Sequence, residues 1–143
     1  MSEAKQIFTD WIVEYLKSKD ANIKQIISIK KSEQGVDVVV EGALKSQYIL
    51  VQPEFKDLSM LDSFKDKHAV IVTANTKKNV EFLITNWDVL TKYPHLSIYF
   101  VNPNSATDKR WIIYPATHDR ITERRALRKG LESMFLTVEE WKG

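Results

Sequence analysis

The chain has 143 residues, of which 28% are charged, with a formal net charge of +2 at pH 7. This length predicts a single domain over 1–143, large enough to bury roughly 70% of its unfolded surface. The absence of cysteine excludes disulfides and thiolate metal sites. No apolar run approaches the roughly 20 residues that span a bilayer, and the N-terminus lacks a signal-peptide pattern, so we expect a cytoplasmic protein without membrane contact.

The N-terminal segment predicts an amphipathic helix over 2–19. Apolar residues recur there at steps of three and four from Ile7 to Leu16, and Ser2 can cap the N-terminus. Alternating apolar and polar side chains then predict a half-exposed strand over 23–31. Gln34 and Gly35 predict the turn into the next strand.

The stretch 35–56 predicts a β-hairpin around which the rest of the chain is organised. Two runs rich in β-branched and aromatic residues flank a short polar connection. Successive side chains on a strand point to opposite faces. In a hairpin that is symmetric about 44–45, Asp37 therefore lies near Gln52, and Glu54 and Lys56 continue that face of the second strand. Two carboxylates and a lysine then converge on one spot.

The remaining pattern alternates helices with short strands. Branched apolar runs predict the strands, and apolar stripes at helical spacing predict the helices. We predict a short helix over 58–64, a strand over 68–75, a helix over 76–93 that Thr76 caps, strands over 96–101 and 111–114, and a long final helix from about Thr122 whose apolar stripe reaches Trp141. A strand, a helix and a strand in succession favour a parallel pair. The predicted fold class is therefore α/β, a mixed β-sheet flanked by helices.

Asp37, followed after a hairpin by Glu54-Phe55-Lys56, resembles the active-site motif of the PD-(D/E)xK nucleases, the restriction-endonuclease-like superfamily. The order of elements is also similar to the αβββαβ core of that superfamily, with an extra strand and a C-terminal helix. The resemblance implies a metal-dependent nucleic-acid phosphodiesterase of the DNA endonuclease or junction resolvase type. It implies that Asp37 and Glu54 hold Mg²⁺ or Mn²⁺ with help from the carbonyl of Phe55. It further implies that Lys56 orients the attacking water or stabilises charge on the phosphorane.

Pro53 leaves a second interpretation open, because proline cannot donate a hydrogen bond to a sheet. A bulge at Pro53 would keep Glu54 facing Asp37, which supports an enzyme. A helix that begins at Pro53 would turn Glu54 and Lys56 away. The superfamily's proline before the Asp is also replaced here by Val36. The alternative function is a non-catalytic nucleic-acid- or protein-binding module on the same fold.

Two groups of basic residues could contact phosphates. One lies in the first turn of the helix predicted after Thr76, where backbone N–H groups attract anions. The other precedes and occupies the first half of the final helix, where a solvated helix face is the alternative. The candidate nucleic-acid-binding residues are Lys77, Lys78, Arg120, Arg124, Arg125, Arg128 and Lys129. We expect DNA rather than RNA as the partner, and a homodimer if the substrate is a duplex, since two strands need two sites.

Overall fold

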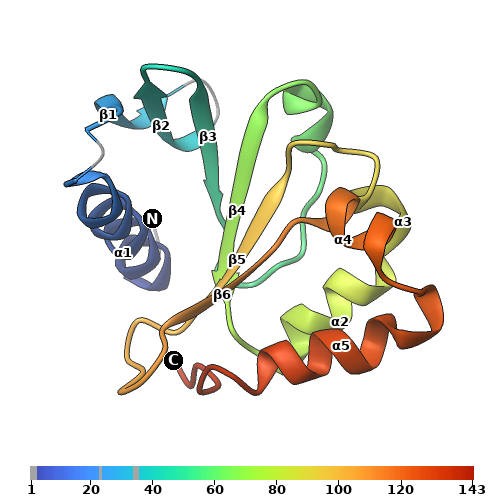
Figure 1. Cartoon of the computed structure of the whole chain (residues 1–143). Coiled ribbons are helices and arrows are strands. Elements are labelled where there is room, and N and C mark those ends of the chain that lie inside the picture. Colours follow the sequence, from blue (N-terminus) through green and yellow to red (C-terminus); the bar gives the residue numbers. More distant parts are fainter. Residues whose placement is uncertain (1–2, 23, 34–35) are drawn as a thin grey trace.

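The computed structural model describes residues 3–22, 24–33 and 36–143, and these residues form a six-stranded sheet with helices on both faces (Figure 1). The elements are α1 (Glu3–Asp20), β1 (Ile26–Glu33), β2 (Val36–Gly42), β3 (Ser46–Val51), the 3-10 helix η1 (Leu61–Phe64), β4 (His68–Ala74), α2 (Lys77–Thr85), α3 (Trp87–Leu90), β5 (Ser97–Val101), β6 (Arg110–Ile113), α4 (Pro115–Ile121), the 3-10 helix η2 (Arg124–Ala126) and α5 (Leu127–Phe135). The predicted α/β class is confirmed.

The spatial order of the strands follows the chain from β1 to β6. β1, β2 and β3 form an antiparallel meander, β3, β4 and β5 run parallel, and β6 returns antiparallel to β5. The predicted parallel pair is therefore present as β4 and β5, with α2 and α3 between them in the chain. Both central strands are buried on their two faces, which explains their nearly continuous apolar sequences.

Two apolar layers enclose the sheet. α1 packs alone on one face, whereas α2, α3, α4 and α5 lie on the opposite side (Figure 1). The stripe of α1 explains its position, because Phe8, Ile12 and Leu16 are four residues apart and at most 7% exposed. No helix in the described ranges is long and apolar enough to cross a membrane.

The hairpin of β2 and β3 differs from the prediction in its register. The observed pairing places Asp37 opposite Leu50 rather than opposite Gln52. The turn centres on residues 43–44, one position earlier than expected, because the N–H of Gly42 donates to the carbonyl of Lys45 at 2.9 Å. A shift of one residue at the centre of a hairpin moves every cross-strand partner by two.

The second strand of the hairpin is also shorter than predicted. β3 ends at Val51, so the prediction that Glu54 and Lys56 lie on this strand is wrong. Pro53 lies neither in a bulge nor at a helix start but in an irregular loop. Asn79 of α2 holds this loop, since its Nδ2 donates to the carbonyl of Pro53 at 2.9 Å. The first strand begins later than predicted, at Ile26, and the predicted short helix is only the four residues of η1.

The helices after β4 are interrupted where the sequence predicts continuous ones. Thr76 caps α2 as expected, with its hydroxyl accepting the N–H of Asn79 at 3.2 Å. Asn86 ends α2, since its backbone and side-chain nitrogens both donate to the carbonyl of Phe82. The predicted helix over 76–93 is therefore two helices, α2 and α3. The predicted helix cap at Ser2 and the predicted turn at 34–35 lie outside the described residues.

The prediction of a single long final helix is also wrong. The 3-10 helix η2 and then α5, which ends at Phe135, lie in its place, and α4, which begins at Pro115, was not predicted. The chain then continues as a tail that Asn75 binds, with the Asn75 amide donating to the carbonyls of Phe135 at 3.2 Å and Val138 at 2.9 Å. Trp141 therefore leaves the helical stripe, and it packs edge to face on Phe8 of α1 with ring centroids 5.1 Å apart.

Candidate functional site

The three motif residues line one hollow next to the end of β3. This hollow has a volume of about 450 Å³. Its polar lining consists of Lys5, Asp37, Gln52, Glu54, Lys56 and Asp57. The structure thus brings Asp37, Glu54 and Lys56 around a common space, although Glu54 and Lys56 come from a loop and not from a strand.

Asp37 is bound on both of its carboxylate oxygens. Lys5 of α1 lies 2.8 Å from Oδ1, and Oδ2 accepts the backbone N–H of Val51 at 2.7 Å. The side chain of Asp37 is only 18% exposed, so these two contacts hold it partly out of water. Lys5 was not predicted as a site residue, because nothing in the sequence relates the first turn of α1 to β2.

Glu54 pairs with a different lysine. Lys78 of α2 lies 2.8 Å from its Oε1, and Lys56 lies 4.0 Å from its Oε2. The hydrogen bond from Lys78, followed by the charges of Lys78 and Lys56, lowers the pKa of Glu54. The loop explains this orientation: the N–H of Phe55 donates to Oδ1 of Asn79 at 2.9 Å, which turns Glu54 toward the start of α2.

Gln52 also has a local role in this hollow. Its Oε1 accepts the N–H of Asp57 at 3.1 Å, and its Nε2 donates to the carbonyl of Asp57 at 2.8 Å. The Gln52 amide therefore fixes the loop that carries Glu54 and Lys56. A pattern of spacings between charged residues gives no sign of this contact.

These contacts do not fit a preformed site for a divalent cation. Mg²⁺ needs carboxylate or carbonyl oxygens that are available to it at about 2.1 Å. Both oxygens of Asp37 already meet a donor, and those of Glu54 meet two ammonium groups. Within the described part of the chain, no group of three or more acidic or histidine side chains could hold a metal ion. Bound Mg²⁺ or Mn²⁺ stays a prediction.

Most of the basic residues predicted to contact phosphates are neutralised by neighbouring acids. The ion pairs are Lys78 with Glu54, Arg124 with Asp88 and Asp119, Arg125 with Glu123, and Arg128 with Glu81. The hydrogen bonds that Arg124 donates to Asp119 and Asp88 raise the pKa of Arg124. Arg120 donates to Thr117, while Lys77 and Lys129 are exposed. Balanced charges give this surface little net attraction for phosphate.

A further cluster, which the sequence analysis missed, lies where α1 meets the edge of the sheet at β6. We name it the aromatic ledge, and it consists of Trp11, Tyr15, Lys19, Arg110 and Tyr114. Trp11 and Tyr15 stack with ring centroids 5.1 Å apart and planes 10° from parallel. The guanidinium of Arg110 lies 4.7 Å from the centroid of the Tyr15 ring, and Nζ of Lys19 lies 5.9 Å from it. Two cations and a second aromatic ring therefore gather around the ring of Tyr15.

Strand geometry places the β6 members of the aromatic ledge together. Ile112 faces Tyr99 of β5 and packs with the α1 layer, so Arg110 and Tyr114, two residues on either side, project to that same face. Tyr114 is 52% exposed, and Arg110 is exposed as well. The spacing of four residues between Trp11 and Tyr15 is visible in the sequence. The position of these two rings beside β6 is not, because it depends on the order of the strands in the sheet.

Comparison with known proteins adds no family to these observations. No protein-family model matches the chain, no curated protein is significantly similar to it, and no solved structure matches its fold significantly. The resemblance to the PD-(D/E)xK nucleases stays a prediction.

Proposed function

We propose that this protein is a non-catalytic nucleic-acid-binding module and that the aromatic ledge binds unpaired bases of a DNA strand. The observation that carries the proposal is the stack of the exposed Arg110 on the half-buried rings of Tyr15 and Trp11. Proteins that bind single strands combine aromatic rings, on which bases stack, with cations that contact the backbone phosphates. A guanidinium that lies over a ring keeps its N–H edges available for phosphate oxygens.

The distribution of ion pairs supports this surface over the one predicted from the sequence. Among the described residues, neither Lys19 nor Arg110 forms a salt bridge, whereas Arg124 and Arg128 each bind a carboxylate. A phosphate that binds Arg124 must compete with Asp88 and Asp119. A phosphate that binds Arg110 has no salt-bridged carboxylate to displace among the described residues.

The hollow around Asp37 supports the non-catalytic form of the proposal. Its two motif carboxylates, those of Asp37 and Glu54, form salt bridges with separate lysines. The ammonium groups of these lysines therefore balance the negative charge that a metal ion would otherwise balance. The metal-dependent phosphodiesterase remains the competing prediction, since Asp37, Glu54 and Lys56 share one hollow. A module that binds one strand at one site does not require the homodimer that duplex cleavage would need.

The binding test uses a single-stranded oligodeoxythymidine of about 20 nucleotides, with a 5′-hydroxyl and a dye at the 3′ end. Fluorescence anisotropy measures its affinity for the wild type, for Arg110→Ala and for the control Arg125→Ala. Arg125 is also exposed, but it pairs with Glu123 in a different part of the chain. We expect Arg110→Ala to weaken binding about tenfold and to reduce its salt dependence, with Arg125→Ala close to the wild type. Equal affinities of all three proteins, or no binding by the wild type, would overturn the proposal.

A second experiment separates the module from the nuclease. Calorimetric titration with Mn²⁺ and Mg²⁺ is combined with nicking assays on plasmid and branched DNA, for the wild type and Asp37→Asn. We expect neither metal binding at millimolar ion concentration nor cleavage in either protein. Metal binding and cleavage in the wild type that both disappear in Asp37→Asn would establish the phosphodiesterase instead.

A further inference from the structure

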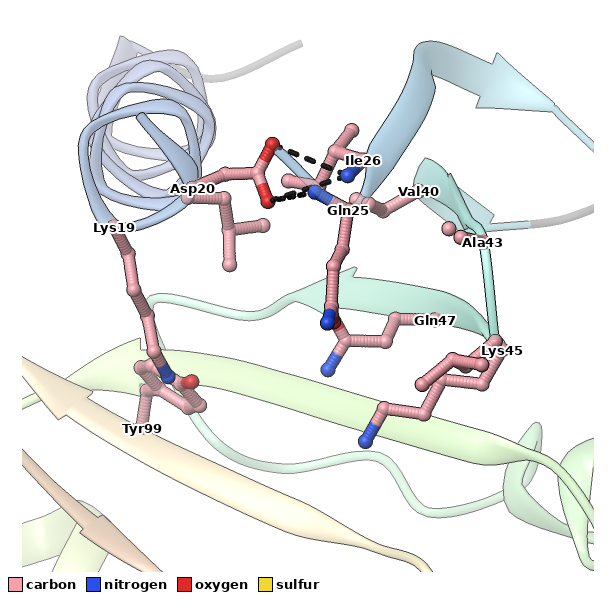
Figure 2. Close-up of a pocket in the computed structure, with 12 residues that line it drawn as sticks. Lys19, Asp20, Gln25, Ile26, Val40, Ala43, Lys45, Gln47 and Tyr99 are labelled. Carbon is pink, nitrogen blue, oxygen red and sulfur yellow. Dashed lines mark hydrogen bonds between the residues drawn. The ribbon is translucent and has the colours of Figure 1, made fainter. Parts of the chain in front are cut away.

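A second hollow of about 450 Å³ opens between the end of α1 and the turn that joins β2 to β3. Figure 2 shows Lys19 and Asp20 on the α1 side of this hollow and Val40, Ala43 and Lys45 on the hairpin side. Its walls are held by backbone hydrogen bonds, since the N–H of Ala43 donates to the carbonyl of Gln25 at 2.8 Å. We name this space the end pocket.

The polar groups of the end pocket are mainly hydrogen-bond donors. The side chains of Gln47 and Lys45 extend toward the open space from the hairpin side, and Gln25 extends into it from the segment before β1 (Figure 2). Lys19 approaches from α1 near Tyr99 (Figure 2). In the described part of the chain, none of the Gln25, Lys45 and Gln47 side chains has a hydrogen-bonding or ion-pairing partner in the protein. An oxygen-rich anion would satisfy several of these nitrogens at once.

The one carboxylate in the lining, that of Asp20, is held by backbone hydrogen bonds. Both oxygens of Asp20 accept backbone N–H groups, from Gln25 at 2.8 Å and from Ile26 at 3.1 and 3.2 Å. Lys17 and Lys19 lie in the last turn of α1, where they offset the partial negative charge of the helix C-terminus. The pocket therefore presents two ammonium groups, Lys19 and Lys45, against one carboxylate that already has its partners.

Tyr99 contributes a neutral hydroxyl to the same lining. Burial, followed by the neighbouring Tyr15 and Tyr114, raises the pKa of Tyr99. The phenol therefore stays protonated at neutral pH and can donate a hydrogen bond to an anion. Tyr15 and Tyr114 belong to the aromatic ledge, and Lys19 belongs to both, so the end pocket is continuous with the surface proposed for the strand.

We infer that the end pocket binds the terminal phosphate monoester of the nucleic-acid strand that lies on the aromatic ledge, an inference that rests on the proposed function. A terminal phosphate carries more charge than an internal diester and has three peripheral oxygens, which suits an open hollow lined by several donors. The aromatic ledge alone would bind any part of a strand. The end pocket adds a preference for the end of the strand.

The first test measures the pocket without a strand. Calorimetry compares thymidine 5′-monophosphate with thymidine, for the wild type, Lys45→Met and the control Lys92→Met, which removes an exposed lysine elsewhere in the chain. We expect the monophosphate to bind the wild type at least about tenfold more tightly than thymidine does, and Lys45→Met to lose most of this preference. Lys92→Met should keep it. No preference in the wild type, or an undiminished preference in Lys45→Met, would overturn the inference.

The second test distinguishes failure of this inference from failure of the proposed function. The oligodeoxythymidine of the anisotropy assay, with its dye at the 3′ end, is compared with a 5′-phosphate and with a 5′-hydroxyl. A second pair of strands, with the dye at the 5′ end, compares a 3′-phosphate with a 3′-hydroxyl. We expect one phosphorylated end to bind about tenfold more tightly than the hydroxyl strand in the wild type and equally in Lys45→Met. If all strands bind equally, the aromatic ledge stands and the end pocket fails. If the wild type prefers the monophosphate over thymidine but does not prefer a phosphorylated strand, the end pocket binds phosphate but not the end of a strand. This result would overturn the inference.

Discussion

The side-chain oxygen of Asn79 accepts the backbone N–H of Phe55 at 2.9 Å, across 24 residues of sequence. The same side chain donates to the carbonyls of Pro53 at 2.9 Å and Ala74 at 2.8 Å. Asn79 is 2% exposed, so it satisfies three backbone groups that water does not reach well. This one amide determines where the loop after β3 turns, and with it the direction of Glu54.

Replacing Asn79 should therefore destabilise the fold strongly. Asn79→Ala leaves the Phe55 N–H and two carbonyls without this partner, and we expect the free energy of unfolding to fall by roughly 3 kcal/mol. Urea denaturation followed by circular dichroism measures the change. The control is Asn86→Ala, whose side chain donates only to the carbonyl of Phe82 and is partly exposed. A loss for Asn79→Ala no greater than that for Asn86→Ala would contradict this role.

Two substitutions at Asp37 separate its ion pair from its hydrogen bond. Asp37→Asn removes the charge that pairs with Lys5 but keeps an oxygen for the N–H of Val51, so we expect a loss below about 1 kcal/mol. Asp37→Ala removes both contacts, and we expect a further loss of roughly 1–2 kcal/mol. Thermal unfolding of the two variants gives the difference. Equal stabilities would mean that the Val51 hydrogen bond contributes nothing measurable.

The raised pKa of Tyr93 should make the free energy of unfolding depend on pH in the alkaline range. Its hydroxyl donates to Asp62 at 2.6 Å, and this hydrogen bond, with burial and the charge of Asp62, raises the pKa of Tyr93 to about 12. An unfolded tyrosine titrates near pH 10. The folded chain therefore holds this proton more tightly, so its contribution to stability is complete below about pH 10 and is lost between about pH 10 and 12.

Tyr93→Phe should remove this part of the pH dependence. Urea midpoints measured between about pH 9 and 11 should fall less steeply for the variant than for the wild type. In the folded variant, the ultraviolet absorbance of tyrosinate should show one fewer tyrosine that ionises with a raised pKa. Tyr99, whose pKa is also raised, is unchanged in the variant and accounts for the slope that remains. Identical slopes in the two proteins would exclude Tyr93 as a source.

Replacing two of the glycines by alanine should change the stability of the protein in opposite directions. A Cβ at Gly42 would lie 2.7 Å from the carbonyl oxygen of Lys45, so Gly42→Ala must open the β2–β3 turn and lower the melting temperature. A Cβ at Gly130 meets no atom within 4 Å, and Gly130 lies inside α5. Gly130→Ala should therefore stabilise the protein by about 1 kcal/mol. Differential scanning calorimetry tests both, and changes of the same sign would contradict the packing described at Gly42.

Local patterns in the sequence were sufficient to predict most elements but not the contacts that end them. The stripe of α1, the capping by Thr76 and the parallel pair of β4 and β5 follow from periodicity and from the order of elements. The end of β3 does not, because it depends on Asn79, which lies 24 residues from the N–H of Phe55 that it accepts. The end of α5 likewise depends on Asn75, which binds carbonyls 60 and 63 residues away.

The candidate site was predictable only as a set of residues around a common space. Asp37, Glu54 and Lys56 do line one hollow, but no pattern in the sequence indicates Lys5 or Lys78 as their ion-pair partners. The aromatic ledge was missed for a related reason. Trp11 and Tyr15 share a face of a helix whatever the fold, whereas their proximity to Arg110 requires all the strands from β2 to β6 to be in place.

The contact between Phe8 and Trp141 has a consequence for biosynthesis. The apolar face of α1 forms early in translation, but the ring that completes its cover is 133 residues later in the chain. α1 therefore stays incompletely covered until residue 141 has left the ribosome. We expect nascent chains that are stalled before this point to present α1 to hydrophobic-binding chaperones, and the full chain to be released from them.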